Sequence, residues 1–374
     1  MEEKRPPAPK TGRLDAVDWL RGLAVVLMIQ THLYDAWVNT AGKATAAYWW
    51  SRYLGGIPSR LFLLLVGVSM AIKFEAQIAK GVDRATMVRG AAKRGLQIVG
   101  LAYLFRLQEF TLSGFGGDPM GLFRIDILNC IGASMIVTAF IAAPRNGKPQ
   151  WLAALAGAAV FVGLGPVIGP AVFPDWLPKP LTSYLGGQRP MAWFQLFPWA
   201  AWALVGVAVG HTWVRASREQ RRQAWAFFLT GAVGLGMTVA VILVRRHDPY
   251  IIRYPNDIVQ QMGPGTFFYR LGTLGPLAFL AYVVARFTPA TWFSPMRQFG
   301  RTSLLVYWIH VDLCYGMVSS RLHHRLGMVG ASVGFVLMTV AMLGVSVLKT
   351  RYWRGFRRRA GGAARAVPST PSAT

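Results

Sequence analysis

Arg21 and His32 are two ionisable residues in the first apolar stretch of the chain, with ten residues between them. Ionisable side chains are costly in a hydrocarbon core, so those found at depth usually face the interior of a helix bundle or a water-filled cavity. On a helix these two side chains lie on nearly the same face, about 16 Å apart along the axis. One stripe of one helix therefore carries a cation near one membrane face and an imidazole deeper inside.

His32 is followed three residues later by Asp35, on the neighbouring face of the same predicted helix. A carboxylate in that position could hold the imidazole in one tautomer and raise its basicity. The neutral imidazole could then remove a proton from an incoming hydroxyl or amine. The structural alternative is that His32 only forms a hydrogen bond to another helix.

A second intramembrane histidine, His310, lies near the C-terminal end of the apolar region. Tyr307 is three residues before it and shares its helix face, whereas Asp312 points elsewhere. His310 is an alternative general base, and it has the same structural alternative as an interhelical hydrogen-bonding partner.

Asp15, Asp18 and Arg21 cluster at the start of the first apolar stretch. Asp18 and Arg21 are three residues apart, so they can form an ion pair that only stabilises the helix entrance. The functional alternative is that Arg21 contacts a phosphate of coenzyme A (CoA), because its planar guanidinium suits phosphate oxygens.

Arg124, Asp126 and Asn129 open another apolar stretch, and Arg106 and Glu109 end the one before it. These groups are expected at the same depth on the outer side of the membrane. They could cap the helix and pair with one another. Alternatively, they could bind a polar acceptor substrate. Four charged groups of both signs at one level indicate a polar pocket, because membrane proteins otherwise avoid such concentrations.

The composition is that of a membrane protein, since only 15% of the 374 residues are charged and 53% are apolar. The formal net charge of +25 could suggest nucleic acid as a partner. The basic residues instead cluster in short segments between apolar runs, as the positive-inside rule requires. This placement excludes nucleic acid and favours a bilayer and anionic cytosolic ligands as partners.

The chain contains ten apolar stretches long enough to span a bilayer, which predicts an all-α bundle of about ten transmembrane helices. With the N-terminus in the cytoplasm, the inner segments carry 25 Lys and Arg residues and the outer loops nine, so both termini are predicted to be cytoplasmic. Residues 1–13 form a cytoplasmic segment, residues 14–348 the membrane domain, and residues 349–374 a basic, disordered tail. The expected spans are 15–38, 56–74, 92–110, 122–143, 151–171, 192–213, 223–244, 265–285, 300–319 and 327–348.

The two cysteines, Cys130 and Cys314, both lie in apolar runs and indicate buried thiols. The sequence has no motif with the spacing of metal ligands, so no metal is expected.

Several segments resemble the transmembrane acyltransferase superfamily. The Arg-x10-His spacing of Arg21 and His32 resembles the first helix of its acyltransferase-3 branch. Other segments are more similar to bacterial relatives of the heparan-α-glucosaminide N-acetyltransferase catalytic domain, in the sister branch. They are residues 61–69, 124–128 with 131–132, 196–199 with Gly206 and Gly210, and 299–310.

This resemblance, which runs from about residue 13 to 345, implies a function and a location. Such proteins lie in the bacterial inner membrane and pass an acyl group, here acetyl, from cytosolic acyl-CoA to a sugar hydroxyl or amine. The acceptor is an extracytoplasmic glycan or glycolipid. The resemblance implies His32 as the catalytic residue and Arg21 as its partner, although the lysosomal enzyme has its active histidine beyond the first helix. That difference leaves His310 and the choice between O- and N-acylation open.

Two mechanisms are compatible with these residues: His32 could act as a general base, or it could form a covalent acyl-histidine. A different class of protein is also compatible with them. A secondary transporter or flippase for a polar glycan-like substrate would use intramembrane His, Arg and Asp as a proton relay. Against this alternative, the chain shows no paired halves with interrupted helices. A non-catalytic membrane scaffold is the remaining alternative.

Overall fold

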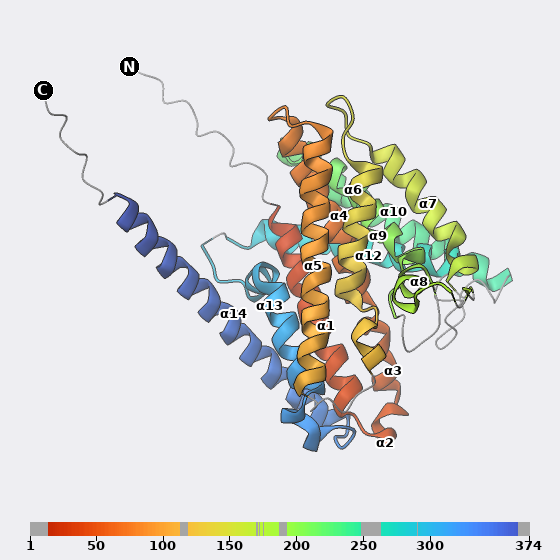
Figure 1. Cartoon of the computed structure of the whole chain (residues 1–374), viewed down its shortest axis with the longest axis vertical. Coiled ribbons are helices and arrows are strands. Elements are labelled where there is room, and N and C mark those ends of the chain that lie inside the picture. Colours follow the sequence, from red (N-terminus) through yellow and green to blue (C-terminus); the bar gives the residue numbers. More distant parts are fainter. Residues whose placement is uncertain are drawn as a thin grey trace, which may run out of the picture.

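The computed structural model describes residues 14–112, 119–169, 171, 173–174, 176–186, 193–247, 263–289 and 291–365. In these ranges the protein is all-α, with isolated bridges and no β-strand (Figure 1). The α-helices are α1 (Asp15–Trp37), α2 (Thr40–Lys43), α3 (Ala46–Gly55), α4 (Ile57–Ile78), α5 (Arg84–Leu112), α6 (Ile127–Ala142), α7 (Trp151–Ile168), α8 (Lys179–Leu185), α9 (Leu196–Ala216), α10 (Gln220–His247), α12 (Pro264–Phe287), α13 (Pro295–Tyr315) and α14 (Met328–Arg365). Short 3-10 turns cover Pro119–Phe123 and Met317–Leu322.

Each of the ten expected spans falls mainly on one of these helices. Among the described residues, six helical stretches are long and apolar enough to cross a membrane, and α6 is apolar but shorter. The protein is therefore an integral membrane protein, while the ten crossings and the direction of the termini stay predictions. The six stretches are 46–78 (α3 with α4), α7, α9, α10, α12 and 328–352 of α14.

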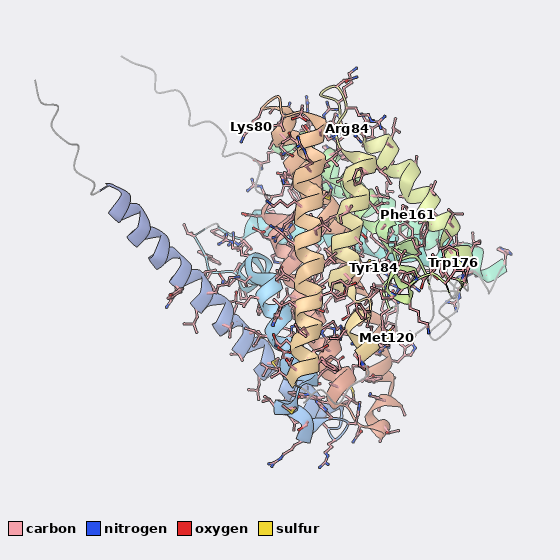
Figure 2. All side chains as sticks on the ribbon, in the orientation of Figure 1. Lys80, Arg84, Met120, Phe161, Trp176 and Tyr184 are labelled. Atoms are coloured by element: carbon pink, nitrogen blue, oxygen red, sulfur yellow. The ribbon has the colours of Figure 1, made fainter. Side chains whose placement is uncertain are left out.

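The bundle has two ends. We call the end at which α1 begins the inner end, following the predicted orientation, and the other end the outer end. Figure 2 shows Lys80, just after α4, and Arg84, the first residue of α5, at one extreme of the bundle, and Met120 toward the other. The Arg84 side chain donates to the carbonyl of Phe140 (2.7 Å), so the start of α5 and the end of α6 also lie at the inner end.

The C-terminal helix is longer than the expected span 327–348. α14 begins at Met328 and continues to Arg365. Ala and Arg are strong helix formers, and they are frequent in this segment. The helix projects away from the bundle over much of its length (Figure 1).

The contact between α1 and α13 depends on two glycines. A Cβ at Gly22 would overlap the backbone of Met296, and a Cβ at Gly300 would overlap the backbone of Asp18. At the outer ends, the Trp37 indole donates to the Cys314 carbonyl (3.1 Å). Because the starts of the two helices touch each other and so do their ends, α1 and α13 run in parallel.

Glycine contacts of the same kind join other helix pairs. Gly67 of α4 meets the backbone of Ala203 in α9, and Gly206 of α9 meets the backbone of Leu64. Small residues are typical of such interfaces because helices in lipid associate by close packing of their backbones.

The segment between α13 and α14 is hydrogen-bonded to the end of α1. The backbone N–H of Leu326 donates to Trp37 (2.9 Å), and that of Asn39 donates to Leu326 (2.8 Å). The N–H of His324 donates to the carbonyl of Ala36 (2.9 Å). These bonds hold the segment after α13 against the outer end of α1.

We expect Gly300→Ala to destabilise the protein by about 1–3 kcal/mol, since the added methyl group overlaps backbone that cannot turn aside. Gly100→Ala on α5 is the matched control, because nothing lies within 4 Å of its added Cβ. Thermal unfolding in detergent measures the difference. Equal unfolding of Gly300→Ala and wild type would show that the close approach does not hold the helices.

Candidate functional site

The two intramembrane histidines are in direct contact. Nδ1 of His32 on α1 lies 2.9 Å from Nε2 of His310 on α13. Their ring centroids are 5.1 Å apart and their planes differ by 10°, so an N–H of one ring points along the lone pair of the other. His310 is fully buried, whereas His32 is partly exposed.

The hydrogen bonds of this pair determine the tautomer of both neutral rings. Nδ1 of His310 lies 2.6 Å from the carbonyl oxygen of Val306. A carbonyl only accepts, so His310 carries its proton on Nδ1 and presents a lone pair on Nε2. His32 must then donate from its own Nδ1, which leaves Nε2 of His32 unprotonated and able to act as a base or nucleophile.

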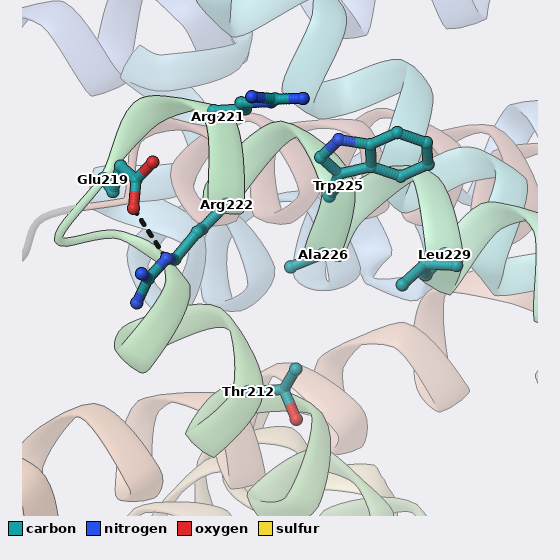
Figure 3. A pocket seen from close by; sticks show the side chains of 7 residues that line it. All are labelled: Thr212, Glu219, Arg221, Arg222, Trp225, Ala226 and Leu229. Carbon is teal, nitrogen blue, oxygen red and sulfur yellow. Dashed lines mark ion pairs between the residues drawn. The ribbon is translucent and has the colours of Figure 1, made fainter.

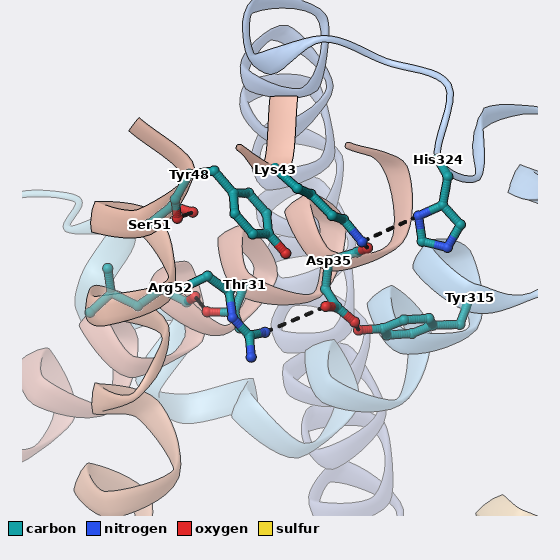
Figure 4. A network of polar contacts seen from close by, with 9 residues as sticks. Thr31, Asp35, Lys43, Tyr48, Ser51, Arg52, Tyr315 and His324 are labelled. Carbon is teal, nitrogen blue, oxygen red and sulfur yellow. Dashed lines mark hydrogen bonds and ion pairs between the residues drawn. The ribbon is translucent and has the colours of Figure 1, made fainter. Parts of the chain in front are cut away.

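The orienting contact that the sequence predicts from Asp35 is made instead by His310. The Asp35 carboxylate accepts from the hydroxyl of Tyr315 (3.0 Å) and pairs with Arg52 (3.4 Å), as Figure 4 shows. Lys43 donates to the carbonyl of Asp35 (2.9 Å). The Tyr315 ring packs edge-on against His32, with centroids 5.8 Å apart. Asp35 thus positions Tyr315 beside the imidazole.

The charged groups expected at the outer end form one network. Arg106 on α5 pairs with both Glu109 and Asp126, and Arg124 lies 3.8 Å from Asp126. Asn129 closes a capping box at the start of α6, where its side chain accepts from the N–H of Asp126 (3.2 Å). The structure therefore brings these predicted residues together.

Aromatic residues connect this network to the histidine pair. The Tyr307 ring lies 6.0 Å from that of His310 and 5.9 Å from that of Phe105, which precedes Arg106. Asn129 donates to the Tyr184 hydroxyl (3.2 Å), which lies 3.1 Å from that of Tyr103. The polar surface at the outer end thus includes two tyrosines from α5 and α8 that the sequence analysis did not select.

Asp18 and Arg21 lie near the inner end, away from the histidines. Their side chains are 3.6 Å apart, and Arg21 also donates to the Ser69 hydroxyl on α4. Asp18 is buried, while the side chain of Arg21 is 29% exposed. Arg21 therefore links α1 to α4 through Ser69, and its side chain is partly exposed.

The sequence analysis did not select two further sets of buried polar groups. Nδ1 of His211 on α9 lies 2.6 Å from Oε1 of Glu75 on α4 at the inner end. Arg60 on α4 and Arg270 on α12 are buried, with their guanidinium groups against the rings of Trp199 (5.1 Å) and Tyr53 (4.5 Å). A charge inside an apolar run was the available signal for both arginines.

No group of three or more potential metal ligands occurs in the part of the chain that the structure describes.

The sequence matches the family model described as heparan-alpha-glucosaminide N-acetyltransferase, catalytic, over residues 13–244. This match covers more than half of the chain. The chain belongs to this family. No curated protein matches it.

Membership in the heparan-α-glucosaminide N-acetyltransferase catalytic family, together with the apolar helices, makes the chain a transmembrane acyltransferase. The matched range contains Arg21, His32, the Arg106 network and the His211–Glu75 pair. His310 lies beyond it on α13, so the partner of His32 comes from a part of the chain that the family model does not cover.

We expect both His32 and His310 to be Nδ1–H tautomers. The Val306 carbonyl accepts from Nδ1 of His310, and Nε2 of His310 then accepts from Nδ1 of His32. Side-chain nitrogen and carbon chemical shifts of histidine-labelled protein distinguish the two neutral tautomers. An Nε2–H tautomer at His32 would contradict this arrangement.

We expect Asp126→Ala to destabilise the protein by about 3–5 kcal/mol, since it removes a partner of the buried Arg106. Glu219→Ala is the control, because it breaks an exposed ion pair with Arg222 and should cost at most about 1 kcal/mol. Chemical unfolding in detergent compares the two variants. Equal losses of unfolding free energy in the two variants would mean that the Arg106 network stabilises the protein no more than a surface ion pair does.

Proposed function

We propose that this protein transfers an acetyl group from cytosolic acetyl-CoA to a hydroxyl or amine of a sugar on the outer side of the membrane. The observation that carries the proposal is the hydrogen-bonded series from the Val306 carbonyl through His310 to His32. It leaves a basic nitrogen at the outer end of α1, on a chain whose family is named for N-acetyl transfer.

In the proposed reaction, Nε2 of His32 takes the proton of the acceptor hydroxyl or amine. The acceptor atom bonds to the thioester carbonyl carbon, and the C–S bond breaks. The proton then passes from His32 to the sulfur of CoA, which leaves as the thiol. In this proposal His310 is a positioning residue, because it holds the His32 ring and has no nitrogen left for substrate.

The two substrates would approach from opposite ends. The partly exposed side chain of Arg21, next to Asp18, is suited to a CoA phosphate at the inner end. The network of Arg106, Arg124 and Asp126 is suited to hydrogen bonds with a sugar at the outer end. Tyr307 and Asn129 would extend this acceptor surface toward His310 and Tyr184.

The test is turnover of radiolabelled acetyl-CoA by purified protein with mixed amino-sugar and hydroxyl-sugar acceptors. We expect His32→Ala to lower kcat by about 10²- to 10⁴-fold, the usual contribution of a general base. His247→Ala is the matched control, because it removes an exposed imidazole in the last turn of α10. Wild-type turnover in His32→Ala would exclude His32 as the base.

For His310 the expected result is a lower kcat with an unchanged KM for acetyl-CoA in His310→Ala. His310→Gln should recover part of the activity, since the amide oxygen can accept from Nδ1 of His32. Equal loss in both variants would contradict the positioning role. Label retained on acid-quenched protein without acceptor would replace the general-base route by an acyl-histidine formed at the same Nε2.

A further inference from the structure

Two adjoining cavities lie where α9 ends and α10 begins, at the inner end. Their volumes are about 500 Å³ and about 440 Å³, and they share Thr212 and Arg222 as lining residues. We call them together the inner bay. Figure 3 shows the larger cavity, with Thr212 facing the first turns of α10 and the Arg222–Glu219 pair at one side.

The inner bay carries an excess of positive charge. Arg215, Arg221 and Arg222 line it, and Glu219 is the one carboxylate among its lining residues. Glu219 is 2.6 Å from Arg222, but both side chains are more than half exposed, so their mutual attraction is weak. An anion in the bay would therefore meet a net attractive field.

A second carboxylate, that of Glu75, contacts a residue that lines the bay. His211 lines the smaller cavity, and its Nδ1 lies 2.6 Å from Oε1 of Glu75 on α4. The imidazole therefore stands between the Glu75 carboxylate and the cavity. Glu75 itself lines neither cavity.

The remaining lining of the bay is aromatic and apolar. Trp151 at the start of α7 and Trp225 on α10 are exposed beside the two cavities. Tryptophan is enriched at the level of lipid headgroups. Leu229, one turn beyond Trp225, is also exposed, and α10 buries only 17% of its most apolar stretch, so other helices leave this wall largely uncovered.

We propose that the inner bay binds the phosphate headgroup of an anionic phospholipid from the adjacent leaflet, which is the cytoplasmic one in the predicted orientation. Arg215 and Arg222 contact the phosphate, and an acyl chain follows Trp225 and Leu229 along α10. The apolar wall favours a lipid over a free phosphate, because inorganic phosphate has no chain to place there. The site does not depend on acyl transfer.

Native mass spectrometry of the full chain, released from detergent with phosphatidylglycerol or phosphatidylcholine, tests this site. We expect one phosphatidylglycerol to be retained and phosphatidylcholine to be lost. Arg215→Gln and Arg222→Gln should each weaken retention about fivefold, the usual effect of one basic residue at a lipid surface. Arg218→Gln is the matched control, because this exposed arginine lies between them in sequence but does not line the bay.

Competition with inorganic phosphate and with CoA separates the possible sources of the phosphate. Retention that survives both competitors and depends on Arg215 and Arg222 supports the proposal. Loss of CoA binding in Arg215→Gln and Arg222→Gln, with lipid retention unchanged, would overturn it and assign the bay to the acyl donor. Equal retention of both lipids, or equal effects of all three substitutions, would also overturn it.

Discussion

The close approach of α1 and α13 at Gly22 and Gly300 is the constraint on which the site depends. Each glycine allows the backbone of the other helix to lie where a side chain would otherwise be. Because the helices run in parallel from this contact, His32 and His310, each ten residues beyond its glycine, meet near the outer end. In lipid, apolar side chains gain little from helix association, so close backbone packing determines which helix faces meet.

The second constraint is that buried charges need partners. Three pairs meet this requirement: Arg106 with Asp126, Asp18 with Arg21, and His211 with Glu75. Each pair except Asp18–Arg21 joins different segments of the fold. The pairs divide by depth. The Asp18–Arg21 and His211–Glu75 pairs lie at the inner end, and the Arg106 network lies at the outer end, next to the histidine pair. This division suits a protein that receives an anionic donor at one end and a polar acceptor at the other.

The helices could be predicted because the hydropathy of a segment depends only on its own residues. An apolar run of about 20 residues in lipid has to form helix to satisfy its own backbone, and each expected span falls mainly on a helix. The Arg106–Asp126 network was predictable for a related reason, since its residues flank one short connection.

The residues that contact His32 could not be predicted in this way. An i,i+3 spacing permits Asp35 to approach the imidazole, but Arg52 and Tyr315 come from other segments and engage its carboxylate. His211 and Glu75 are 136 residues apart and showed no pattern that links them. In both cases the partner is determined by how helices pack, and no local rule of sequence spacing encodes that packing.

The sequence by itself determined that this is a helical membrane protein with ionisable residues at depth, because residue type and hydropathy decide partition into lipid. It also supplied both histidines as candidates for the base. Only the tertiary structure shows how they are arranged: both nitrogens of His310 have partners, whereas among the described residues only Nδ1 of His32 has one. The physical reason is that a tautomer depends on which atoms surround the ring, and here those atoms belong to a helix 278 residues away.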